Sequence, residues 1–291
     1  MPPLHVPASD GHPLAADLYL PEGPPRSVVL LAPAMGVKRG FYAPFARYLA
    51  EGGAAVVCAD FRGIGGSRPP GGLRGFPATL RDWADGDLAG VLAWARERWP
   101  EVPVQWFGHS IGGQLFGLVD EPPVERALLV ASQSGYWRHW HGLPRLGMGA
   151  LWHLVPLITA VAGKLPMRAF RQGEDVPAGV AREWAEWGRH PDYIFSVAGK
   201  RPRSGFETWR GSLRAVSFAD DGYAPSPSVA ALVDGFRTPD REHIHLRPAD
   251  VGLPAIGHFG AFRPKMQAPL WASWRDWLLG LTSSAAARRS A

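Results

Sequence analysis

The sequence predicts an α/β fold in which helices cover both faces of a mostly parallel sheet. Short continuous apolar runs suit strands that are buried on both faces, and they are too short for helices of usual length. Segments with helical spacing of apolar residues separate these runs, and this alternation favours a doubly covered sheet. The apolar runs are residues 27–32, 54–59, 104–107, 127–131 and 213–218.

The elements at the two ends of the chain complete this core. Residues 4–20 predict two short strands around the Asp-Gly turn at positions 10 and 11. Helical spacing follows in residues 41–49 and 80–94, and we expect the second helix to end before Pro100. The last helix, in residues 270–281, places its large apolar residues on one packing face. These residues are Trp271, Trp274, Trp277 and Leu278.

The strand–helix alternation stops between residues 135 and 211, which predicts a helical cap or lid inserted over the sheet. We therefore divide the chain into a core (1–134 and 212–281), a lid (135–211) and a flexible tail (282–291). The apolar stretch 151–165 contains His153, Pro156 and Lys164, so we interpret it as a lid element too short and interrupted for a membrane span. Docking of this stretch on a membrane surface is the alternative.

Composition excludes several classes of function. The 291 residues carry a formal net charge of +5, but arginine supplies most of the positive charge and is scattered along the chain. A nucleic-acid-binding surface would cluster that charge, so we expect no nucleic-acid partner. The single Cys58 lies in an apolar run and predicts a buried thiol without a disulfide or a metal. The N-terminus has no pattern of a signal peptide, which makes the cytoplasm the expected location.

A nucleophile motif gives the strongest functional signal. Gly108-His109-Ser110-Ile111-Gly112 follows an apolar strand and precedes a segment compatible with a helix. A Gly-x-Ser-x-Gly pattern in that context is typical of a sharp turn that exposes the serine hydroxyl, since glycines remove side chains that would collide there. We predict Ser110 as the nucleophile.

A serine hydroxyl needs a base within hydrogen-bonding reach. Of the late histidines, His243 and His245 lie in a segment that resembles a strand, where histidine is usually structural. His258 lies in a glycine-flanked loop before the last helix, where catalytic groups tend to occur. We therefore predict His258 as the base.

The acid of the triad is expected at the end of the strand that follows the lid. Asp220 and Asp221 both occupy that place. One carboxylate can accept the second N–H of the imidazole, and the other is expected in a turn. We favour Asp221 over Asp220, with Asp250 as a distant third choice.

The oxyanion of an acyl-transfer intermediate needs two N–H donors. One is expected from the backbone of Ile111, which follows the nucleophile. The other is expected from the loop Pro33-Ala34-Met35-Gly36, where we favour Met35 and keep Ala34 open as a one-residue shift.

With these residues in place, nearly the whole chain resembles the α/β-hydrolase superfamily. The motifs that carry the resemblance are the elbow at 108–112, the segment 60–67, the Asp221 loop and Gly257-His258-Phe259-Gly260. The chain is also similar to a bacterial group of predicted α/β hydrolases. It lacks the His-Gly pair of many esterases in the oxyanion loop. The segment 60–63 is expected to shape the rim of the pocket.

The resemblance implies a serine hydrolase that acts on carboxylic esters or thioesters through an acyl-serine intermediate. Aromatic residues of the lid suggest an apolar acyl or aromatic substrate, and no cofactor or metal is expected. An acyltransferase with the same triad, or a ligand-binding protein without turnover, are the alternatives. The aromatic residues in question are Trp137, Trp140, Trp152, Phe170, Trp184 and Trp187.

Overall fold

An eight-stranded sheet forms the centre of the molecule. The computed structural model describes residues 4–170, 172–198 and 204–281, and within them the strands follow the order β1-β2-β4-β3-β5-β6-β9-β10. β1 and β2 pair antiparallel, as do β2 and β4, whereas every pair from β4 to β10 is parallel. The strands are β1 Leu4–Pro7, β2 Pro13–Tyr19, β3 Ser27–Ala32, β4 Ala54–Ala59, β5 Val104–His109, β6 Arg126–Val130, β9 Ser212–Phe218 and β10 Arg241–Leu246.

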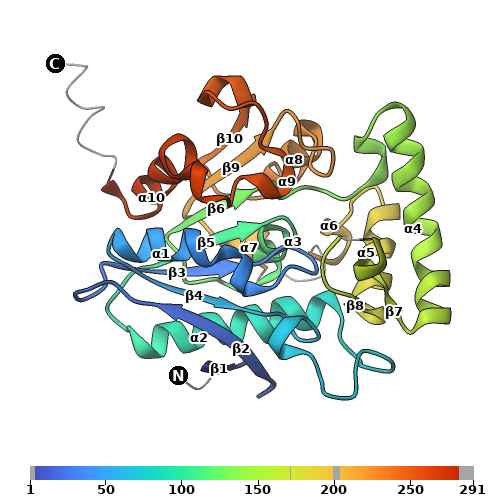
Figure 1. Ribbon diagram of the computed structural model, residues 1–291, viewed down its shortest axis with the longest axis horizontal. Coiled ribbons are helices and arrows are strands. Elements are labelled where there is room, and N and C mark those ends of the chain that lie inside the picture. The colour runs from blue at the N-terminus through green and yellow to red at the C-terminus, as the bar shows by residue number, and fades with distance from the viewer. Residues whose placement is uncertain (1–3, 171, 199–203, 282–291) are drawn as a thin grey trace.

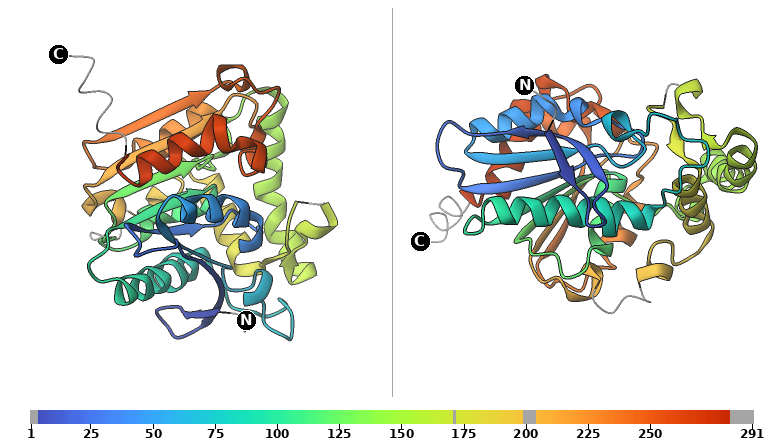
Figure 2. Two further views of the ribbon diagram at one scale, coloured as in Figure 1. Left: turned by 60° about the vertical axis from the view of Figure 1, so that its left-hand side comes forward. Right: turned by 90° about the horizontal axis from the view of Figure 1, so that it is seen from below.

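Helices cover both faces of the sheet, with α1 and α10 on one face and α2 on the other (Figures 1 and 2). A π-helical stretch, Asp82–Leu88, leads into α2, and another, Gln267–Trp271, leads into α10. The helices of the core are α1 Ala43–Glu51, α2 Ala89–Arg98, α3 Ile111–Gln114, α8 Ser226–Val233, α9 Gly257–Gly260 and α10 Ala272–Leu278.

The central strands β3, β4 and β5 are buried along their whole length, which explains their continuous apolar sequences. The predicted alternation of strands and helices is therefore confirmed, and so are the N-terminal hairpin and the strand that contains His243 and His245. Cys58 is a buried free thiol on β4. The predicted tail, residues 282–291, lies outside the described residues.

Between β6 and β9, the described residues form helices and one small two-stranded sheet, and they add no strand to the central sheet. This part lies at one end of the molecule, far from the described N-terminal strand (Figure 1). Its elements are α4 Gly142–Ala162, β7 Lys164–Leu165, β8 Val176–Pro177, α5 Ala178–Arg189, α6 Phe195–Ala198 and α7 Gly205–Thr208.

The prediction of a short, interrupted apolar stretch at 151–165 is wrong, because α4 is a continuous helix of 21 residues that includes Pro156. Proline has no N–H, so the carbonyl of Trp152, four residues earlier, loses its helical donor. The Arg189 guanidinium donates to that carbonyl over 2.5 Å and replaces the missing hydrogen bond.

By length and composition, α4 is the one helix in the described part of the chain that could cross a membrane. The argument from length that excluded a span is therefore also wrong. One face of α4 packs on the protein, with Trp152, Val155 and Thr159 buried. The Trp152 and Trp184 rings meet edge to face, 4.6 Å apart, which joins α4 to α5.

Phe45 joins three elements of the core, and its removal tests how they depend on one another. Its ring is fully buried and lies 4.7 Å from Phe107 on β5 and 5.3 Å from Trp271 at the start of the last helix. We expect Phe45→Ala to lower the free energy of unfolding by about 3–5 kcal/mol in urea titrations, because it opens a cavity among large rings. Leu20→Ala, at an exposed position, should change it by less than about 0.5 kcal/mol. Equal losses in the two variants would contradict this description of the core.

Candidate active site

Ser110 occupies the sharp turn between β5 and α3. Its backbone angles are φ 52° and ψ −119°, which non-glycine residues rarely adopt. The Ser110 N–H donates to the carbonyl of Val130 at the end of β6, 3.0 Å away, and this bond fixes the turn to the neighbouring strand. Such strain persists only where the surroundings impose it, and it is frequent at active sites.

The glycines beside Ser110 make this turn sterically feasible. A Cβ on Gly108 would lie 2.4 Å from the Cα of Gly113, and one on Gly112 would lie 2.2 Å from the carbonyl oxygen of Ala32. Both distances are far below a van der Waals contact. The glycine pattern in the sequence therefore has a direct steric cause.

His258 and Asp221 meet through a hydrogen bond of 2.8 Å between the imidazole Nδ1 and a carboxylate oxygen. Both side chains are buried. The second oxygen of Asp221 accepts the N–H groups of Tyr223 and Ala224, at 2.8 and 3.1 Å. These bonds fix the carboxylate, which in turn leaves the imidazole Nε2 as the nitrogen available to a nucleophile.

Asp220 has a different structural task from its neighbour. Its two carboxylate oxygens accept the N–H groups of Ile256 and Gly257, at 2.8 and 3.1 Å. Asp220 thus orders the loop that carries His258, and Asp221 contacts the ring. Asp250, the third choice from the sequence, pairs with Arg247 instead.

The loop after β3 contains the two candidates for the second oxyanion donor. The N–H of Ala34 donates to the hydroxyl of Tyr42 over 2.9 Å and is thereby occupied. Within the described residues, no hydrogen bond uses the N–H of Met35, and Met35 borders the same cavity as Ser110. This arrangement favours Met35, together with Ile111, as donors to an oxyanion.

A buried chain of hydrogen bonds joins this loop to the His258 loop. Tyr42 contacts Nδ1 of His109 at 2.8 Å, and Nε2 of His109 contacts the carbonyl of His258 at 2.9 Å. A carbonyl only accepts, so Nε2 carries the proton, Nδ1 accepts from the tyrosine hydroxyl, and that hydroxyl accepts from Ala34. Burial holds the pKa of His109 well below its usual value, with a smaller contribution from nearby His258. The ring therefore stays neutral and keeps these roles.

Ser110 and His258 border one small cavity of about 90 Å³. In the described residues there is no hydrogen bond between the serine hydroxyl and the imidazole, and such bonds often tighten only when substrate binds. Apolar side chains form most of the wall. They are Met35, Trp140, Met148, Leu151, Trp152, Met167, Trp184 and Phe259.

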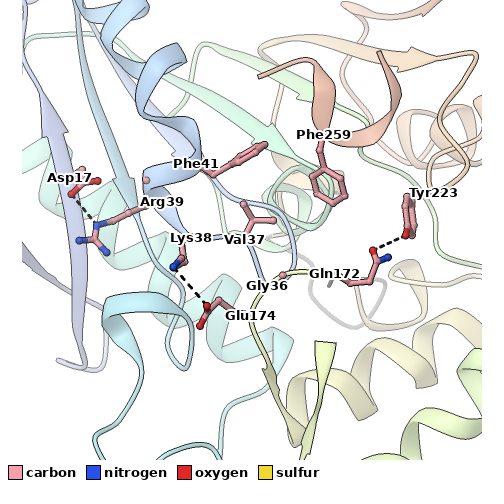
Figure 3. A pocket seen from close by; sticks show the side chains of 12 residues that line it. Asp17, Gly36, Val37, Lys38, Arg39, Phe41, Gln172, Glu174, Tyr223 and Phe259 are labelled. Atoms are coloured by element: carbon pink, nitrogen blue, oxygen red, sulfur yellow. Dashed lines mark hydrogen bonds and ion pairs between the residues drawn. The ribbon is translucent and has the colours of Figure 1, made fainter. Parts of the chain in front are cut away.

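An open groove of about 930 Å³ adjoins this cavity (Figure 3). Gln172, Tyr223 and Phe259 border both spaces. The Tyr223 hydroxyl donates to the amide oxygen of Gln172 over 2.7 Å, so this pair lies between the inner cavity and the outer groove. Asp17 and Glu174 also line the groove, and each is paired with arginine.

The aromatic residues that the sequence analysis named in the predicted lid have different surroundings in the structure. Trp140, Trp152 and Trp184 line the cavity. Trp187 is buried away from it, and Phe170 is exposed. The remaining one, Trp137, packs beneath the guanidinium groups of two arginines.

Two other sequence motifs have structural contacts away from the cavity. The rings of His243 and His245 both contact the hydroxyl of Ser217, at 2.7 and 2.8 Å. Asp60 is fully buried and accepts the N–H groups of Arg39 and Gly66, at 2.7 and 2.8 Å. It therefore holds the loop after β3 through Arg39, and it lines neither the cavity nor the groove.

Sequence reasoning missed Tyr42, Gln172 and Tyr223, and it gave His109 no role of its own. The one feature of the sequence that could have indicated a role for His109 is its position directly before Ser110, the predicted nucleophile. No feature of the sequence indicated a role for Tyr42, because its partner His109 lies 67 positions away in the chain. Within the described residues, no group of three or more His, Cys, Asp or Glu side chains is arranged to hold a metal ion.

Comparison with known proteins identifies the family of the chain. Residues 23–181 match the model of a family described as serine aminopeptidase, S33. The chain belongs to this family. No curated protein sequence matches it significantly.

Solved structures agree with the S33 family in fold, at low sequence identity. A monoacylglycerol lipase from Paleococcus ferrophilus has 14% identity, a TM-score of 0.61, and coverage of 92% of this chain and 98% of its own. A soluble variant of monoglyceride lipase from Saccharomyces cerevisiae has 13% identity, a TM-score of 0.68, and coverage of 94% and 95%. An esterase from Exiguobacterium antarcticum has 14% identity, a TM-score of 0.63, and coverage of 95% and 99%. The predicted α/β-hydrolase fold is confirmed, and this S33 member is an α/β hydrolase.

The two neighbouring aspartates of this S33 hydrolase should respond differently to substitution. Asp221→Asn removes the carboxylate that accepts from His258, so we expect kcat for a p-nitrophenyl acyl ester to fall by about a thousandfold or more. Asp220→Asn keeps one acceptor for the His258 loop, so we expect a loss of about tenfold at most. Steady-state kinetics on folded variants, verified by circular dichroism, test this difference. A larger loss from Asp220→Asn would reverse the two roles.

The buried hydroxyl of Tyr42 should matter for both stability and turnover. Tyr42→Phe leaves the Ala34 N–H and a His109 nitrogen without a partner, which is expected to cost about 1–3 kcal/mol in the free energy of unfolding. We also expect a lower kcat with little change in KM, because the loop with the predicted oxyanion donor loses a hydrogen bond that holds it in place. The matched control is Tyr48→Phe on α1, the helix that begins directly after Tyr42, and no comparable loss is expected in either measurement. Indistinguishable variants would rule out a positioning role for Tyr42.

Proposed function

We propose that this protein hydrolyses carboxylic esters or thioesters through an acyl intermediate on Ser110. The observation that carries the proposal is that Ser110, on a strained turn, borders the same cavity as His258, which is hydrogen-bonded to Asp221. A nucleophile, its base and the group that orients the base are thus combined in one site.

The proposed reaction has two halves. His258 Nε2 takes the proton of the Ser110 hydroxyl while the serine oxygen bonds to the acyl carbon. The N–H groups of Ile111 and Met35 stabilise the resulting oxyanion, and Asp221 stabilises the imidazolium. Imidazolium then protonates the leaving alcohol or thiol as its bond to the acyl carbon breaks. Water, activated by His258, repeats the sequence and releases the carboxylic acid.

The shapes of the two spaces suggest how a substrate lies. The apolar inner cavity suits the acyl group, and the outer groove suits the leaving group. At about 90 Å³, the cavity is smaller than the roughly 300 Å³ or more of a typical ligand site, so it admits only part of a long acyl chain in this conformation. An acceptor alcohol in the groove would make the same residues an acyltransferase.

An ester substrate fits this site better than a peptide with a free N-terminus. An aminopeptidase needs a carboxylate to bind the substrate ammonium. The two acids of the groove are already engaged, Asp17 with Arg39 and Glu174 with Arg68 and Arg168.

The domain division also remains a proposal, with residues 135–211 as the lid on a core of 1–134 and 212–281. The absence of a central strand from the described residues between β6 and β9 supports it. We further propose a small acyl compound as the partner and the cytoplasm as the location.

Replacement of the nucleophile tests the proposed function. Ser110→Ala should reduce turnover of p-nitrophenyl acyl esters and of acyl thioesters by about a thousandfold or more. Ser134→Ala, at a buried serine that does not line the cavity, serves as the control and should retain most activity. Initial rates on both variants, with their melting curves, provide the measurement. Undiminished hydrolysis by folded Ser110→Ala would reject the proposal.

A further inference from the structure

The outward face of α4 is a continuous apolar stripe. Its residues follow the 3–4 spacing of one helix face over about 27 Å, at 1.5 Å per residue. At its two ends, Leu143 is 82% exposed and Val161 is 81% exposed. α4 forms an outer edge of the molecule in both views from different directions (Figures 1 and 2). We define the α4 stripe as Leu143, Leu146, Ala150, Leu154, Leu157 and Val161.

The opposite face of α4 is mostly apolar as well, and His153 is the one polar side chain among the exposed residues of this helix. Trp152, Val155 and Thr159 on that face are buried against the protein. A helix that is apolar all round is normally covered on all sides, by protein or by lipid. Because α4 comes close to this pattern, we expect another molecule to cover the α4 stripe.

The charged residues of α4 and of the chain segments directly before and after it are of one sign. From residue 126 to residue 173 the sequence contains no Asp or Glu. At the N-terminal end of the helix, the guanidinium groups of Arg138 and Arg145 lie over the Trp137 ring, at 5.1 and 5.0 Å. At the C-terminal end, Arg74 donates to the carbonyl of Ala162 over 3.5 Å. Cations thus flank both ends of the α4 stripe.

The inner side of the same helix borders the catalytic cavity. Met148, Leu151 and Trp152 line that cavity, and Leu151 is also 37% exposed. A molecule held on the outside of α4 is therefore separated from Ser110 by the thickness of one helix.

We propose that α4 docks on the surface of an anionic lipid membrane, with the α4 stripe among the acyl chains and the flanking arginines at the phosphate groups. An apolar stripe with cationic ends fits that boundary. A second copy of the chain fits less well, because antiparallel pairing of two α4 helices would bring the cations of one end against those of the other. Docking would bring membrane-borne acyl compounds next to the cavity wall that α4 forms.

Vesicle co-sedimentation tests the docking. Full-length protein should bind vesicles of phosphatidylcholine and phosphatidylglycerol and bind phosphatidylcholine alone more weakly. Leu157→Glu should weaken binding by about tenfold or more, because it places a charge in the stripe. The matched control Leu20→Glu, at a 54% exposed leucine outside α4, should bind like the native protein. Arg145→Gln should weaken binding to the anionic vesicles by about fivefold and reduce its salt dependence.

Three results would overturn the docking proposal: no binding to either vesicle, equal binding of Leu157→Glu and Leu20→Glu, or a dimer in sedimentation velocity that Leu157→Glu dissociates. If Leu157→Glu does not fold, Arg145→Gln decides the question by itself, and unchanged binding to anionic vesicles then rejects the proposal. Sedimentation requires no turnover. It is repeated with Ser110→Ala, which should bind like the native protein, so that failure of docking and failure of the proposed reaction are distinguishable.

Discussion

The strained turn at Ser110 is the constraint on which the rest of the site depends. Its positive φ is combined with close packing of α3 against β3, which leaves Gly112 no room for a side chain. Ser110 follows β5 at the carboxyl edge of the sheet, where the loops after the parallel strands β3, β9 and β10 also begin. The hydrogen-bonded chain Ala34–Tyr42–His109–His258 then joins the loop after β3 to the His258 loop through the residue before Ser110.

Sequence alone predicted the parts of the fold that local pattern determines. Buried parallel strands read as continuous apolar runs, and the elbow needs glycines at fixed positions, so both could be found without coordinates. The choice between Asp220 and Asp221 could only be a preference, because adjacent residues share a loop and differ in the direction of their side chains. Contacts such as that of Tyr42 with His109 join distant segments and leave no local pattern.

The helix α4, in the segment predicted as a lid, shows a further limit of sequence reasoning. Pro156 in the sequence predicts an interruption, since proline removes a helical hydrogen bond. Arg189, from the next helix, supplies the missing donor, and that partnership is a tertiary contact. The resulting long helix combines two apolar faces. One closes the catalytic cavity and the other is open to the surroundings, so substrate access and the exposed stripe belong to the same element.

The central claim is that Ser110 is a nucleophile activated by His258. Peptide mass spectrometry after treatment with a fluorophosphonate tests it most directly, since this reagent traps an activated serine as a covalent adduct. The account predicts one adduct, on Ser110, and a labelling rate reduced by about a hundredfold or more in His258→Ala. An unlabelled Ser110 in folded native protein, or labelling at an undiminished rate in His258→Ala, would contradict it.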